Sequence, residues 1–139
     1  MRGNSTGLLD FARKTVNRLL LAMFFAAAGL NHFIAPSAYV QILPRALPWP
    51  LALIYISGAA EILGGIGVLF PPTRRLAALG LIALLVAVFP ANIYAALHGM
   101  QIGGRAIPHW ILWARLPLQL LLIAWVYIAC LNERRLSSS

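Results

Sequence analysis

Four apolar stretches occupy most of this chain and constrain its fold more than any other feature. Each is about as long as the roughly 20 helical residues that cross a bilayer core about 30 Å thick. Because no water is available at that depth, each backbone must satisfy its own hydrogen bonds, which favours helices over strands. The sequence therefore predicts an all-α, polytopic membrane protein. Its four-transmembrane-helix bundle is expected at residues 16–34, 51–70, 76–97 and 110–131.

The composition excludes an ordinary soluble domain. Of the 139 residues, 61% are hydrophobic and 10% are charged, whereas a soluble domain carries roughly 25% charged residues. One small soluble core could not bury four such stretches. We therefore expect one membrane domain, 16–131, between a basic N-terminal segment, 1–15, and a C-terminal tail, 132–139. The apolar run continues from Val16 to Ile34, so we interpret the first stretch as a retained signal anchor rather than a cleaved signal peptide.

Basic residues alternate between the two ends of the predicted bundle. Most of the basic residues lie at or before the start of the first helix, between the second and third, and after the fourth, namely Arg2, Arg13, Lys14, Arg18, Arg74, Arg75, Arg134 and Arg135. The other two loops contain only Arg45 and Arg105. Short loops rich in Lys and Arg stay in the cytoplasm, which predicts cytoplasmic termini in the inner (plasma) membrane. The net charge of +8 then indicates contact with anionic membrane lipids rather than nucleic acid.

The loops are expected to differ in form. Residues 71–75 predict a tight turn on the cytoplasmic side. Residues 35–50 contain four prolines and cannot form one continuous helix. Ser37 is a candidate N-cap for a short helix that ends at Leu43. We interpret this loop either as a lid over the outer end of the bundle or as a plain connector. Three aromatic residues suit the outer headgroup level, namely Tyr39, Trp49 and Trp110.

Glu61 lies in the middle of the second apolar stretch, where a carboxylate is costly and usually marks a functional site. Arg115, the only basic residue well inside any of the four stretches, is its expected partner. Ser57, Glu61 and Gly65 lie four residues apart and so share one helix face. This face of small residues either packs closely on a neighbouring helix or leaves space for a ligand.

Polar residues in all four stretches fall at a similar level in the outer half of the membrane. This candidate ligand site contains Asn31, His32, Ser57, Glu61, Asn92, Arg115 and Gln119. Pro90 and Pro117 interrupt two helices near the same level, where broken helices often line a cavity. The simpler alternatives are structural. Glu61 and Arg115 would form an ion pair, the amides of Asn92 and Gln119 would bond between helices, and the prolines would only bend the helices. No metal ligand set is expected.

Four short motifs follow one another along the chain. They are Gly29-x-Asn31-His32-Phe33-x-x-Pro36, Ser57-Gly58-x-x-Glu61-x-x-Gly64-Gly65, Phe89-Pro90-Ala91-Asn92 and Arg115-x-Pro117-x-Gln119. Together they resemble the DoxX-like family of small four-helix membrane proteins over nearly the whole chain. This resemblance implies a link to quinone or thiol redox chemistry, with the polar residues of these motifs at the buried site. The chain departs from disulfide-exchange enzymes because Cys130 is its single cysteine.

Two functions are compatible with these observations. The first is a quinone- or small-molecule-binding subunit of a membrane redox system, with Glu61 and His32 as proton-transferring catalytic residues. If it is an enzyme, it is part of a quinone-linked oxidoreductase that takes electrons from a redox partner. The second is a non-enzymatic membrane scaffold or assembly factor held together by a Glu–Arg pair. A haem held by His32 and His98 is a weaker alternative, and neither haem nor metal is expected. A homo-oligomer is compatible with either function.

Overall fold

The computed structural model describes residues 3–132 and is almost entirely helical. Its elements are α1 (Gly3–Ile34), α2 (Pro36–Val40), α3 (Pro50–Gly67), α4 (Pro71–His98), β1 (Gln101–Ile102), β2 (Arg105–Ala106) and α5 (His109–Cys130). Four helices, α1, α3, α4 and α5, are long and apolar enough to cross a membrane. The predicted four-helix architecture is confirmed at this level. The short antiparallel hairpin of β1 and β2 was not predicted.

At the start of α1 and of α4, the helix extends further than predicted. Residues before 16 continue α1 as far as Gly3 instead of forming a separate segment. Residues 71–75 form the first turn of α4 rather than a tight turn, because proline at the first helical positions loses no hydrogen bond. The chain reverses at residues 68–70. The predictions about Arg2, Arg134 and Arg135 lie outside the described residues.

Side chains from the first turn of α4 cap the C-terminal end of α3. The Thr73 hydroxyl donates to the Gly67 carbonyl at 2.7 Å. Arg74 donates to the carbonyls of Val68 at 2.8 Å and Leu69 at 3.3 Å. The last carbonyls of a helix have no partner within it, so these bonds fix α3 and α4 as antiparallel neighbours.

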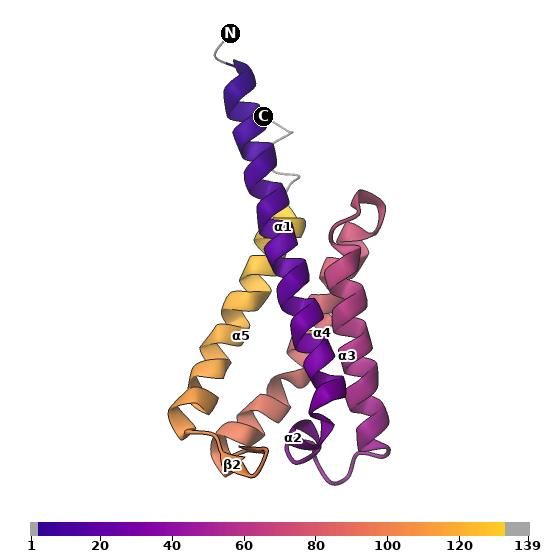
Figure 1. Cartoon of the computed structure of the whole chain (residues 1–139), viewed down its shortest axis with the longest axis vertical. Coiled ribbons are helices and arrows are strands. Elements are labelled where there is room, and N and C mark those ends of the chain that lie inside the picture. Colours follow the sequence, from indigo (N-terminus) through magenta and orange to yellow (C-terminus); the bar gives the residue numbers. More distant parts are fainter. Residues whose placement is uncertain (1–2, 133–139) are drawn as a thin grey trace.

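The four long helices define two ends of the molecule (Figure 1). The α3–α4 turn and the end of α5 lie at one, which we call the turn end. The beginning of α1 extends beyond it. The opposite end contains α2 and the β1–β2 hairpin, and we call it the hairpin end (Figure 1).

Helices α1 and α3 approach each other through glycine. A Cβ added at Gly58 would lie 2.7 Å from the Gly29 carbonyl oxygen, and one added at Gly29 would lie 2.5 Å from the Gly58 oxygen. Closer to the turn end, a Cβ at Gly65 would lie 3.0 Å from the Ala22 oxygen. Only glycine permits such contact between the two backbones without displacement. Part of the predicted small-residue face therefore packs closely on a neighbour.

Two buried clusters hold the bundle together. The larger one belongs to the half nearer the turn end and contains Leu21, Ala22, Phe25, Val68, Ala78, Leu81, Leu85, Val126, Ala129 and Cys130. The smaller one joins α2 to α4 and α5 at the hairpin end and contains Ala38, Ile42, Ala95, Ala96, Met100 and Leu112.

Helix α2 is shorter than predicted and begins differently. It ends at Val40, and its N-cap is Ala35, which makes no side-chain capping bond. Ser37 is therefore not the N-cap. Pro36 occupies the first helical position, where its fixed backbone angle favours a helix start without a polar cap.

Candidate functional site

A cavity of about 240 Å³ lies inside the bundle, lined by residues from all five helices. Most of its lining is apolar. Six of the seven predicted site residues line it, namely His32, Ser57, Glu61, Asn92, Arg115 and Gln119. The seventh, Asn31, is exposed and does not line the cavity. The polar residues of four separate helices therefore do meet in one place.

Glu61 is 8% exposed and carries an unsatisfied oxygen. Its Oε2 atom is buried and makes no hydrogen bond within the described part of the chain. His32 faces this oxygen, with its Nε2 3.6 Å from Oε2, a distance longer than a hydrogen bond. A buried carboxylate oxygen without a partner is costly, so it requires an explanation in a native structure.

The proton position on His32 follows from its second contact. Its Nδ1 lies 3.1 Å from the Ile54 carbonyl oxygen. A carbonyl oxygen only accepts, so Nδ1 carries a proton. In neutral His32, Nε2 is then an acceptor that faces Oε2 of Glu61. The Nε2 and Oε2 atoms attract each other only when a further proton lies on one of them.

The predicted Glu61–Arg115 ion pair does not form. Among the described residues, Arg115 has one polar contact, from Nη1 to the Met100 sulfur at 3.6 Å. At about 1.5 Å per residue, Glu61 lies roughly 16 Å along α3 and Arg115 roughly 9 Å along α5, measured from the hairpin end. This difference of more than a helical turn separates the charges. A thioether is a weak acceptor, so the guanidinium lacks a strong acceptor.

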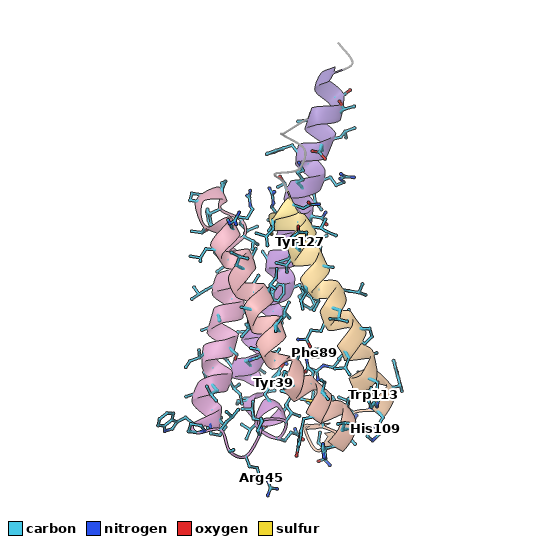
Figure 2. The ribbon with its side chains drawn as sticks, turned by 180° about the vertical axis from the view of Figure 1, so that it is seen from behind. Tyr39, Arg45, Phe89, His109, Trp113 and Tyr127 are labelled. Atoms are coloured by element: carbon cyan, nitrogen blue, oxygen red, sulfur yellow. The ribbon has the colours of Figure 1, made fainter. Side chains whose placement is uncertain are left out.

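Asn92 and Gln119 form a polar bridge between α4 and α5. The Asn92 amide donates to Gln119 Oε1 at 2.6 Å, and Gln119 Nε2 donates to the Leu85 carbonyl. Pro90 lies inside α4, and Figure 2 shows α4 changing direction near Phe89. The amide bridge thus braces the bend that the proline introduces. For these two residues, the interhelical interpretation agrees with the geometry.

The sequence predicts Tyr39 at the headgroup level, but its ring lies against His32 with ring centroids 4.1 Å apart. Its hydroxyl accepts a hydrogen bond from the Asn31 amide at 2.7 Å, and the residue lines the cavity. One sequence signal was present, because Tyr39 belongs to the apolar side of the proline-bounded segment after α1. No signal marked Met100 as the contact of Arg115.

The histidines near the hairpin are separate from this cavity. His98 and His109 are exposed and line a different, open pocket beside the hairpin. The His98 ring stacks on Tyr94 at 4.2 Å. His32 lines the cavity, whereas His98 lines the pocket beside the hairpin.

A family model described as a domain of unknown function, DUF8561, matches residues 21–130. The chain belongs to this family. The DUF8561 match runs from the middle of α1 to the end of α5 and includes every residue that lines the cavity. No curated protein and no solved structure matches the chain. The resemblance to the DoxX-like family stays a prediction.

Proposed function

We propose that this protein binds the polar head group of a quinone, or of a similar small molecule, in its cavity as a subunit of a membrane redox system. The observation that carries the proposal is a pair of unsatisfied polar groups on the same cavity. Glu61 Oε2 has no hydrogen-bond partner among the described residues. Arg115 contacts only a thioether there. Together they offer one acceptor and one donor to a ligand.

A quinone head group matches these two groups chemically. Its carbonyl oxygens accept hydrogen bonds, as Arg115 requires, and its reduced form has hydroxyl groups that donate, as Glu61 requires. The cavity of about 240 Å³ is smaller than the roughly 300–1,000 Å³ of pockets that enclose drug-sized ligands. It therefore suits a substituted ring better than a complete lipid.

The Glu61–His32 unit supplies a proton at the cavity wall. His32 Nε2 and Glu61 Oε2 lie 3.6 Å apart, so a proton carried by either group can pass to a bound acceptor, after which Oε2 is free to accept from the reduced ring. Quinone reduction consumes protons and electrons, so this chemistry also requires a reduced partner protein as the electron source. His32 is held by the Ile54 carbonyl and the Tyr39 ring, which fixes its orientation toward Glu61.

We infer an orientation in the inner (plasma) membrane from the described charges. Arg13, Lys14 and Arg18 belong to the first half of α1, and Arg74 and Arg75 to the start of α4. The loops of the hairpin end contain Arg45 and Arg105. The excess of positive charge assigns the turn end to the cytoplasm. The cavity then lies in the outer half of the bilayer.

The test is mass spectrometry of the lipids that copurify with detergent-extracted protein. We expect a quinone with the wild-type protein and its loss from Glu61→Gln, because the amide no longer offers a carboxylate oxygen. Asp10→Asn is the matched control, since it also removes one carboxylate. Asp10 is paired with Arg13 and Lys14 at the protein surface and does not line the cavity.

Size-exclusion chromatography and thermal unfolding must show that all three proteins are folded. Failure of the wild-type protein to retain or rebind a quinone would refute the proposal and favour the scaffold function. Equal quinone content in wild type and Glu61→Gln would show that Glu61 does not form the site.

A further inference from the structure

The cavity is closed toward the turn end by the larger buried cluster. Phe25 and Leu85 belong to that cluster and also line the cavity, so they form its floor. Beyond them lie Leu21, Leu81 and Val126, each at most 1% exposed. Close packing of these described residues closes the cavity toward the turn end.

The hairpin end is covered by α2, which is fastened to the hairpin. Ala38 and Ile42 of α2 and the following turn are buried in the smaller cluster. The Gln41 amide then makes two hydrogen bonds to the backbone of Gln101. Its Nε2 donates to the Gln101 carbonyl at 2.6 Å, and its Oε1 accepts from the Gln101 N–H at 2.9 Å. These paired bonds hold the cover in place.

The remaining side of the cavity lies between α1 and α5. Phe24 on α1 and Leu118 on α5 both line the cavity, and yet they are 41% and 49% exposed. Each has a second lining residue one turn further along its helix, Ala28 and Leu122 respectively. Residues that belong both to the cavity wall and to the outer surface mark an opening.

The contacts between α1 and α5 explain why an opening exists there. The two helices meet nearer the turn end, where the rings of Phe24 and Trp125 lie 6.4 Å apart and Arg18 Nε donates to the Ala129 carbonyl at 3.2 Å. Toward the hairpin end they diverge (Figure 1). There α1 packs on α3 through Gly29, and Leu112 of α5 packs with α2 and α4.

We propose that this opening is a lateral portal, through which the head group of an amphipathic lipid-soluble ligand enters from the bilayer while its tail remains between Phe24 and Leu118. The proposal rests on the proposed function, because it assumes that the cavity binds a head group. The cavity volume supports it, since a long apolar tail does not fit in about 240 Å³. The ligand class is thereby narrowed to molecules with a compact polar ring and a long apolar chain.

The test compares two ligands with one head group, a decyl-tailed benzoquinone and the same benzoquinone without its tail. Binding to purified protein in nanodiscs is measured for wild type and for Leu118→Trp, which narrows the portal. We expect Leu118→Trp to weaken binding of the tailed quinone by about tenfold, or about 1.4 kcal/mol, because the tail loses its exit. The tailless quinone should lose clearly less affinity than the tailed one in Leu118→Trp, because it places no tail beside that residue.

Two control variants separate the possible routes. Leu120→Trp adds the same bulk to α5 at a residue that is 58% exposed and does not line the cavity, so it should leave both affinities unchanged. Gln41→Ala releases α2 from the hairpin. If Gln41→Ala alters the binding of the tailed quinone and Leu118→Trp does not, the ligand enters under α2 and the portal is refuted.

The remaining outcomes distinguish the two proposals. If both quinones bind the wild type and Leu118→Trp behaves like Leu120→Trp, the portal is wrong but the proposed function stands. If neither quinone binds the wild type, the proposed function fails and the portal fails with it.

Discussion

The two halves of the bundle use the same four long helices but are packed in different ways. Near the turn end, α1, α3, α4 and α5 converge on side chains that are almost completely buried, such as Leu21, Val68 and Val126. Toward the hairpin end, α1 and α5 diverge and α2 covers that end of the bundle. A cavity with a buried carboxylate remains between the helices. Close packing in the first half and the contact of α1 with α3 at Gly29 and Gly58 hold the helices together, so the second half can retain costly polar groups.

The largest effect is expected where the backbones of α1 and α3 touch. Gly58→Leu forces a side chain into the Gly29 carbonyl, 2.7 Å from the new Cβ, and backbone atoms cannot yield as a flexible side chain can. We expect loss of folded protein, seen as a missing monodisperse peak in size-exclusion chromatography. Gly80→Leu is the control, because a Cβ at Gly80 meets nothing within 4 Å. Similar profiles for both variants would contradict the close approach.

The next prediction separates stability from binding. Leu81→Ala removes a side chain that is 1% exposed in the larger buried cluster, and such truncations cost about 2–5 kcal/mol. We expect a lower thermal unfolding midpoint in detergent, with unchanged quinone affinity of the folded protein. Leu79→Ala, at a residue 46% exposed, should change the midpoint little. A large loss of affinity in Leu81→Ala would show that the two halves are not independent.

The difference between the halves also explains what could be predicted from sequence. The length of the apolar stretches is enough to predict helices, so the number of spans and the approximate position of each were predicted. Helix ends were less predictable, because they depend on tertiary partners such as the Thr73 and Arg74 bonds that close α3. The hairpin of residues 101–106 contains no alternating apolar pattern, so its strands had no signal.

For the site, most of the residues were predictable from the sequence, but their pairing was not. Six of the seven candidates reach the cavity because polar groups in apolar helices avoid lipid. A Glu61–Arg115 pair is predicted because opposite charge is the only sign of a partner that the sequence contains. The actual neighbour, His32, follows from the contact of α1 and α3 at Gly29 and Gly58. Such a contact between residues far apart in sequence is not encoded in any local pattern.

Arg115→Gln should lower quinone affinity and leave stability nearly unchanged, which is the reverse of the result expected for Leu81→Ala. Its guanidinium contacts only the Met100 sulfur among the described residues, so we expect the stability to change by about 0.5 kcal/mol or less. A hydrogen bond from a charged donor contributes about 1.5–3 kcal/mol, so quinone affinity should fall roughly tenfold or more. Arg45→Gln, on the exposed loop before α3, is the control and should preserve both properties. A strongly destabilised Arg115→Gln would assign the residue a structural role.

A smaller effect is expected at the amide bridge between α4 and α5. Gln119→Leu removes the bonds to Asn92 and to the Leu85 carbonyl, and polar interactions between membrane helices average about 0.6 kcal/mol with a maximum of about 1.7. Unfolding free energies of Gln119→Leu, Asn92→Leu and the double variant form a double-mutant cycle. Additive effects of the single substitutions would show that the two amides do not act as one bridge.

The smallest effect is expected at Tyr39 of α2, where substitutions separate the role of the aromatic ring from that of the hydroxyl. Tyr39→Phe removes the exposed acceptor of the Asn31 amide but keeps the ring against His32. An exposed neutral hydrogen bond contributes about 0.5–1.5 kcal/mol, so we expect a loss near the lower value and unchanged quinone affinity. Tyr39→Ala also removes the ring that orients His32, and it should weaken quinone binding while Tyr39→Phe does not. Equal quinone binding by the two variants would show that the Ile54 carbonyl alone positions His32. Helix α2 would then only cover the cavity at the hairpin end.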